Sequence, residues 1–331
     1  MAAAALLSAG LAGAFATHAL RGPRDLPETP PATLRETGLF TDAGIMTFAP
    51  QYPLWSDGAS KRRWISLPEG ASIDASEVDA WQFPVGTRLW KEFSFHGRPA
   101  ETRTMFRTAS GWHYATYVWS ADGTTATLAP ATGAASVEIA PGVRHRIPSQ
   151  ADCRACHASG PTPVLGFSAI QLSPDRDPNA VHRETPPADG VDLEDLVAGG
   201  KLRGLPPELL ETPPRIPGPP VERAALGYLH ANCGGCHRGD GPISTVGMEL
   251  AHSVASPGAA RRTAVAQPSR FMAPRLRIAP GAHADSVIYA RMSARTPVEQ
   301  MPPLGTQLVD EEATRMIATW IDQLAKEKRK P

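Results

Sequence analysis

Net charge is what this sequence of 331 residues lacks, because 33 basic and 33 acidic side chains cancel to a formal charge of zero. The balance therefore gives no indication of a nucleic-acid surface, which is usually rich in Lys and Arg. Aromatic side chains are also scarce, at 6% of the chain, and hydrophobic residues make up 42%. With 34 prolines and 29 glycines, this composition is typical of a loop-rich protein with small cores.

Long apolar runs are missing after the first nineteen residues, so no segment reaches the roughly 18 apolar residues that a membrane-spanning helix needs. Residues 1–19 are rich in Ala and Leu and contain no Lys or Arg, and Arg21 and Arg24 follow directly. This pattern is typical of an export signal, although an Ala-rich start without fixed structure would look similar. We expect an exported, periplasmic mature protein without a membrane span.

Residues 44–148 carry the signals of short strands separated by turns. Branched and aromatic residues favour strands at 64–67, 81–95, 102–108, 112–119 and 124–128. Turns are expected at 109–111 and at 121–123, where Asp122-Gly123 readily adopts the positive φ angles of a tight hairpin. We predict an antiparallel β domain, in the form of a sandwich without chemistry of its own, preceded by a Pro- and Glu-rich linker at 20–43.

The rest of the chain is predicted to be helical after a Pro-rich connecting segment at 149–219, which has one short helix near Leu193. Apolar residues recur at helical spacing from 221 to 229 and again from 309 to 324, with acidic residues before the second stripe and basic residues after it. Gly227 and Tyr228, placed opposite Trp320, would let these helices cross closely. Residues 220–331 thus form a predicted helical domain, and the fold class is α+β multidomain.

The four cysteines of the chain all lie in two Cys-x-x-Cys pairs, and a histidine follows each pair directly: Cys153, Cys156 and His157, then Cys233, Cys236 and His237. A Cys-x-x-Cys-His run is the attachment site of c-type haem, in which the two thiols bond the porphyrin and the adjacent imidazole ligates the iron. With 10 histidines in the chain, two such coincidences would be rare, roughly one in a thousand on composition. The pattern therefore predicts two covalently bound haems.

Three other interpretations of the cysteines remain open. A four-cysteine zinc site usually has its pairs about 15 to 20 residues apart, whereas Cys153 and Cys233 are 80 positions apart. A redox-active dithiol would need a βαβ setting, and a pair of structural disulfides would not explain the histidines. Export also favours haem attachment, because a free dithiol would oxidise outside the cytoplasm.

A sixth ligand for the second haem iron is predicted at Met301, which stands before Pro302 and Pro303 in a stiff loop that leads into the last helix. The other methionines are better explained as core residues. For the first haem no methionine lies between His157 and Cys233, and the sequence does not decide among five weak candidates: Met105, His113, His145, His182 and His230.

Residues 233–324 contain Cys233-Gly234-Gly235-Cys236-His237, Arg277-Ile278-Ala279-Pro280-Gly281, the run 286–292, Met301-Pro302-Pro303 and Trp320-Ile321. On these residues the segment resembles the class I cytochrome c domains of many bacterial periplasmic proteins. In such domains the methionine before the two prolines is the usual distal ligand, so the resemblance implies that role for Met301.

The segment 52–172 resembles a family of bacterial diheme cytochromes of unassigned physiological role. The matching runs are Pro53-Leu54-Trp55-Ser56-Asp57-Gly58, Lys61-Arg62-Arg63-Trp64-Ile65, Phe83-Pro84-Val85-Gly86-Thr87, Glu101-Thr102-Arg103, Tyr117-Val118-Trp119, Pro148-Ser149, Asp152-Cys153 and the run 164–172. The resemblance implies a β-rich domain joined to haem domains, and it supplies no substrate. The sequence differs from the family pattern at 112–115, which leaves any role of His113 open.

These observations predict a periplasmic electron carrier that exchanges electrons with redox partner proteins and has no catalytic side chains of its own. One alternative is a diheme peroxidase or oxidase in which the first haem iron is five-coordinate. Another is a β domain that binds a polysaccharide or a partner through exposed tryptophans such as Trp55, Trp64, Trp81 and Trp112.

Overall fold

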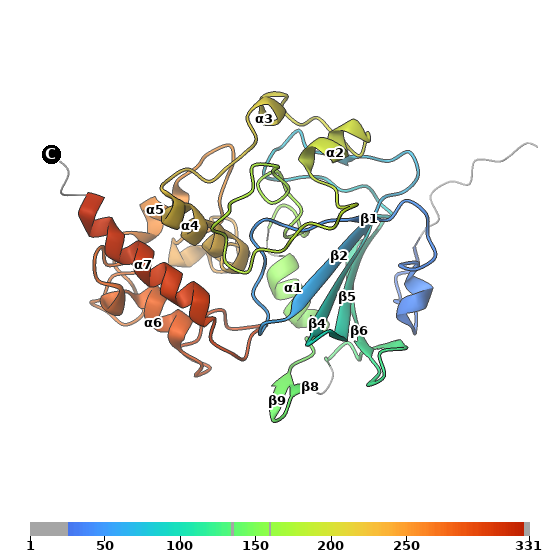
Figure 1. Ribbon diagram of the computed structural model, residues 1–331, viewed down its shortest axis with the longest axis horizontal. Coiled ribbons are helices and arrows are strands. Elements are labelled where there is room, and N and C mark those ends of the chain that lie inside the picture. Colours follow the sequence, from blue (N-terminus) through green and yellow to red (C-terminus); the bar gives the residue numbers. More distant parts are fainter. Residues whose placement is uncertain (1–25, 134–135, 159, 328–331) are drawn as a thin grey trace, which may run out of the picture.

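The structure is a computed structural model that describes residues 26–133, 136–158 and 160–327, so the predicted export signal lies outside the described residues. Figure 1 shows a β-sheet on one side, a group of helices on the other, and helix α1 (Gln150–His157) between them. The sheet comes first in the chain and the helical region follows it, which confirms the predicted α+β class. No helix in the described part of the chain is long and apolar enough to cross a membrane.

The main sheet has six antiparallel strands in the order β1-β2-β4-β5-β6-β7. Their bounds are Met46–Thr47, Ser60–Ser66, Arg88–Phe95, Arg98–Thr108, Gly111–Trp119 and Ala126–Leu128. Two small ladders accompany it: β3 (Ile73–Asp74) with β10 (Leu202–Arg203), and β8 (Val137–Ala140) with β9 (Val143–His145). Both predicted hairpin turns are present, and Gly123 has a φ of 70°.

The predicted sandwich is wrong, because helices and loops rather than a second large sheet cover the two faces of the main sheet. One face carries Ile65, Leu89, Met105 and Tyr114 in one row, and these pack against residues 164–172 and α2 (Leu193–Ala198). The predicted strand at 81–95 begins only at Arg88, since Trp81 and Phe83 precede it as buried loop residues of the same core.

The opposite face of the sheet is covered by the end of the segment predicted as a linker. Leu34, in a 3₁₀ turn at Leu34–Thr37, and Leu39 are buried against Trp90 and Tyr117. Trp90 also donates an indole hydrogen bond of 2.9 Å to Thr37. The last part of 20–43 is therefore a structural part of the β unit.

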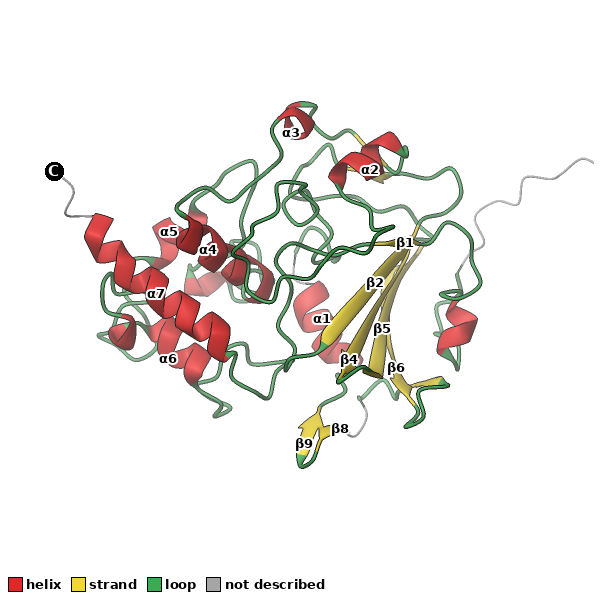
Figure 2. Cartoon of the chain, viewed as in Figure 1, coloured by secondary structure: helices red, strands yellow, loops and turns green. Residues whose placement is uncertain are grey.

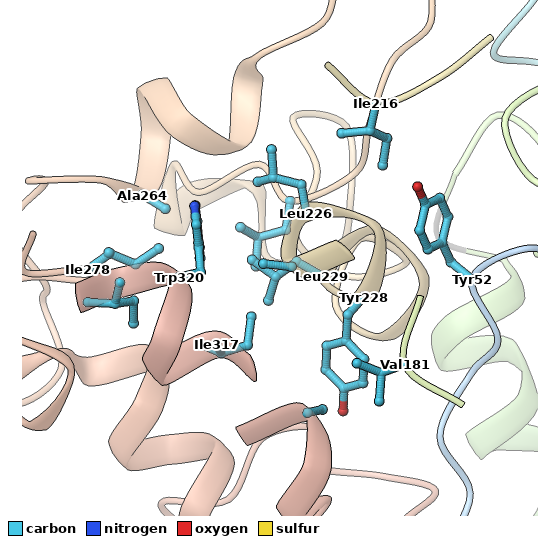
Figure 3. Close-up of a cluster of buried hydrophobic side chains, with 14 of the residues drawn as sticks. Tyr52, Val181, Ile216, Leu226, Tyr228, Leu229, Ala264, Ile278, Ile317 and Trp320 are labelled. Atoms are coloured by element: carbon cyan, nitrogen blue, oxygen red, sulfur yellow. The ribbon is translucent and has the colours of Figure 1, made fainter. Parts of the chain in front are cut away.

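The C-terminal region has four helices, drawn red in Figure 2, around one apolar core. They are α4 (Pro220–Asn232), α5 (Ala259–Ala264), α6 (Val287–Ser293) and α7 (Glu311–Glu327), with 3₁₀ turns at Ser244–Val246 and His283–Asp285, and the shorter α3 (Glu208–Glu211) lies in the preceding segment. Figure 3 shows Trp320 of α7 beside Leu226 and Leu229 of α4. The two long helices thus pair as predicted.

Gly227 has a different role from the predicted one. A Cβ atom at this position would collide with the ring of Tyr52, which stands between β1 and β2 in the sequence and lies on the other side of α4 from Trp320 (Figure 3). Because residue 227 has no side chain, the ring of Tyr52 can pack closely against α4. The glycine therefore does not bring α4 and α7 together.

Carboxylates of the β half bind backbone amides of the helical half at two places. Asp57 accepts hydrogen bonds from the N–H groups of Gln307 and Leu308, at 2.8 and 2.9 Å. Asp79 accepts from the N–H groups of Val254 and Ala255. These bonds connect loops that are far apart in the sequence, so the two halves pack as parts of one structure.

Candidate haem attachment sites

The first Cys-x-x-Cys-His motif forms helix α1. Ser149 begins the helix by accepting a hydrogen bond of 3.0 Å from the N–H of Asp152, whose carboxylate in turn accepts the N–H of Ser149 at 2.9 Å. This reciprocal capping box satisfies amide groups that the first helical turn would otherwise leave free. Because Cys153, Cys156 and His157 are three and four positions apart, the helix presents them on one side.

The imidazole of His157 is held in an orientation suited to metal ligation. Its Nδ1 atom lies 2.7 Å from the carbonyl oxygen of Pro163, which can only accept, so Nδ1 carries the proton. Nε2 is then unprotonated, and metal-binding histidines usually have their other ring nitrogen fixed in this way. Burial, with the positive charges of Lys91 and Arg103, lowers the pKa of His157 to about 4, so the ring is neutral at physiological pH.

The α1 helix lies against the sheet through β6. The ring of Tyr114 is 5.7 Å from the ring of His157, and Cys153 packs on the apolar face that contains Tyr114 and Met105. Burial raises the pKa of the Cys153 thiol, and the positive charge of Arg103 acts against that rise. The sheet face therefore forms the surroundings of the first motif.

The second motif continues α4 into a turn. The N–H of Cys233 bonds the carbonyl of Leu229 at 2.9 Å, and the N–H of His237 bonds the carbonyl of Cys233 at 2.9 Å. Gly234 is required here because a Cβ would collide with the backbone of Ala251. The helix thus delivers the two thiols and the imidazole in a fixed geometry.

The imidazole of His237 is buried and its Nδ1 atom has no hydrogen-bond partner within the described ranges. Burial, with the positive charges of Arg291 and Arg277, lowers its pKa to about 4. The non-ligating nitrogen of His237 therefore lacks the fixed carbonyl partner that His157 has at Pro163. A neutral, buried imidazole beside two thiols fits the donor set of a c-type haem.

The two motifs lie against each other, although Cys153 and Cys233 are 80 positions apart in the sequence. The Cys236 thiol points at the carbonyl oxygen of Ala155 in α1, at 4.0 Å. A hydrogen bond between the thiols of Cys156 and Cys236 lowers the pKa of Cys236 to about 7 and raises that of Cys156. Residues that follow the two motifs line one open hollow of about 330 Å³. They are Ala158 and Gly160 after the first motif, and Asp240, Gly241 and Pro242 after the second.

No disulfide joins any two of the four cysteines. Among the residues that the structure describes, no three His, Cys, Asp or Glu side chains are grouped to hold a metal ion.

Met301 lies in the loop between α6 and α7. Its N–H bonds the carbonyl of Arg291 at 2.9 Å, and the guanidinium of Arg291 is one of the two charges that act on His237. The Gln300 side chain donates to the carbonyls of Pro302 and Thr306, at 3.1 and 3.4 Å, which fixes the loop. The methionine is half-buried, and its role as an iron ligand stays a prediction.

The five candidates for a sixth ligand at the first motif have other roles. Three histidines bond side chains: His113 to Thr108, His145 to Glu101 and His182 to Asp310. His230 accepts the N–H of His252 at 2.9 Å, and Met105 is buried in the core of the sheet.

Four cations beside the first motif were not predicted as functional residues. Three of them are directly opposite one another on neighbouring strands, and the fourth is two residues away on β2, so that all four side chains lie on one face of the sheet. They are Lys61, Arg63, Lys91 and Arg103. In the sequence they are scattered basic residues of β2, β4 and β5, and no spacing pattern distinguishes them from other surface cations.

Comparison of the chain with family models, with curated proteins and with solved structures found no match.

Proposed function

We propose that this protein is a diheme c-type cytochrome of the periplasm that carries electrons between redox partner proteins. The observation that supports this most strongly is the contact between the two Cys-x-x-Cys-His motifs, with the thiol of Cys236 at 4.0 Å from the carbonyl of Ala155. Unrelated surface motifs would have no reason to meet, whereas two attached haems must be close to exchange electrons. A bound haem iron supplies one-electron chemistry by alternating between its ferric and ferrous states.

The residues of the chain have separate tasks in this proposal. The four thiols form the thioether bonds to the two porphyrins. His157 and His237 ligate the irons as neutral imidazoles, and the carbonyl of Pro163 fixes the tautomer of His157. Met301 supplies the second ligand to the iron at His237, which raises its reduction potential relative to a pair of histidines.

Intact-protein mass spectrometry with a haem stain tests the proposal on protein exported from a bacterium able to attach haem c. We expect two added haem masses in the wild type and one in either double variant, Cys153→Ser/Cys156→Ser or Cys233→Ser/Cys236→Ser. Each double variant is the matched control for the other. A wild-type protein without haem, or with a Cys156–Cys236 disulfide in its place, would contradict the proposal.

A diheme peroxidase or oxidase is the second candidate, because the four histidines considered as a sixth ligand of the first haem iron form hydrogen bonds with other residues. An iron with a free coordination position can bind peroxide or another small ligand. A reduced-minus-oxidised spectrum separates the two candidates. Two low-spin haems favour the carrier, and a high-spin haem that reacts with peroxide favours the enzyme.

A further inference from the structure

A row of cations crosses the sheet face beside the first motif. Arg63 pairs in register with Lys91, and Lys91 with Arg103, on the adjacent strands β2, β4 and β5. Side chains directly opposite each other in an antiparallel sheet lie about 4.5–5.5 Å apart at Cβ, and like charges there are destabilising. Lys61 extends this cationic row, two residues before Arg63 on the same face.

The carboxylates of this face do not balance the cationic row. Arg63 bonds Glu184, at 3.0 Å for one of its two contacts, and Arg103 bonds Glu101 at 2.5 Å. Within the described residues, no carboxylate forms an ion pair with Lys61 or with Lys91, whose ammonium lies 4.9 Å from the centre of the Phe93 ring. Direct contacts thus pair Arg63 and Arg103 with carboxylates, whereas Glu184 and Asp310 act on Lys61 only at longer range.

The environment makes the charges of Lys61 and Lys91 costly. Burial lowers the pKa of Lys91 well below its ordinary value and that of Lys61 to about 8. Both lysines are half-buried, and a charge that is partly removed from water is stabilised by a partner of opposite charge. An anion with two negative charges would supply direct partners for Lys61 and Lys91.

The position of the cationic row identifies the anion. Tyr114, whose ring is 5.7 Å from that of His157, lies on the same face of the sheet as Arg103, because its partner Met105 is two residues after Arg103 on β5. Arg103 also acts electrostatically on the thiols of Cys153 and Cys156. A haem bonded to these thiols would carry two propionate carboxylates, and Lys and Arg are the residues that bind carboxylates most strongly.

We infer that Lys61, Arg63, Lys91 and Arg103 bind the two propionate groups of the haem attached at α1. This inference rests on the proposed function and adds a binding site that the two motifs do not define. The sheet then anchors the cofactor, so the β domain has a direct role in setting the potential of the first haem.

Potentiometric titration of the two-haem protein tests the inference, with Lys91→Met as the main variant. Losing this cation should favour the oxidised state and make reduction of the first haem about tenfold less favourable, which is about 59 mV for one electron. The second haem should be unaffected, and the first is identified as the haem whose potential a Met301→His variant leaves unchanged. Lys201→Met, a half-buried lysine just before β10, is the matched control and should change neither potential.

Two further variants guard against misfolding and purely structural effects. Lys91→Arg should preserve the wild-type potential, and Lys61→Met should lower it in the same direction as Lys91→Met. Succinate, a free dicarboxylate, should not raise the melting temperature of the holoprotein, because the propionates already occupy the cationic row.

The outcomes separate the inference from the function on which it rests. Two haems with unchanged potentials in both Lys91→Met and Lys61→Met would overturn the inference and leave the function intact, as would stabilisation by succinate. A wild-type protein without haem would overturn the function itself.

Discussion

Replacing Asp57 by alanine should loosen the loop that carries Met301. The carboxylate of Asp57 is buried and accepts the N–H groups of Gln307 and Leu308 at 2.8 and 2.9 Å, a few residues after Met301. It also lies 3.6 Å from His145. Alanine would remove these acceptors without offering any replacement, and the loop would lose its fixed position against the β half.

The magnitude follows from the number and kind of bonds lost. A hydrogen bond to a charged group contributes about 1.5–3 kcal/mol, and water can reach these part-buried amides to compensate in part. We expect Asp57→Ala to lower the free energy of unfolding by about 2–4 kcal/mol. Urea denaturation followed by fluorescence measures this change through a lower midpoint at constant slope.

Asp79→Ala is the matched control for this experiment. Asp79 also connects the two halves by accepting backbone N–H groups, those of Val254 and Ala255, but it is exposed and distant in sequence from the Met301 loop. We expect it to cost about 1 kcal/mol and to leave the potential of the second haem unchanged. If both variants were equally stable, or if Asp57→Ala kept the wild-type potential of the second haem, the anchoring role of Asp57 would be refuted.

Three other predictions concern acid stability, helix packing and iron ligation. Burial alone would raise the pKa of Asp57, but hydrogen bonds with His145, Leu308 and Gln307 outweigh it and lower the pKa. The stabilisation is therefore present above about pH 3.9, the ordinary Asp value, and is lost as the pH falls through the folded-state pKa, so Asp57→Asn should show a shallower loss of stability in acid than the wild type. Gly227→Ala should lower stability by about 1–3 kcal/mol through the collision with Tyr52, against the gain of about 1 kcal/mol that alanine normally brings to a helix, and an unchanged or raised melting temperature would contradict this. Met301→His should lower the potential of the second haem, while Met272→Leu, at an exposed methionine, should leave it unchanged; equal potentials in the two variants would exclude Met301 as a ligand.

Local signals predicted the elements of this fold well. Alternating and branched residues marked the strands β4, β5 and β6, and the apolar stripes marked α4 and α7. These patterns work because side-chain direction follows the period of the backbone, so a buried face is visible in the sequence. The number of layers was not visible, and the sandwich prediction failed because a loop such as 164–172 can cover a sheet as well as a second sheet can.

The sequence by itself determined which residues form the two motifs, since the order Cys-x-x-Cys-His is a property of neighbouring residues. Only the tertiary structure decided that the motifs meet, that Gly227 receives Tyr52, and that Lys91 lies between two arginines beside His157. Such contacts depend on how distant segments pack and on strand register, where a shift of one residue would turn every side chain to the opposite face. A local pattern contains neither kind of information.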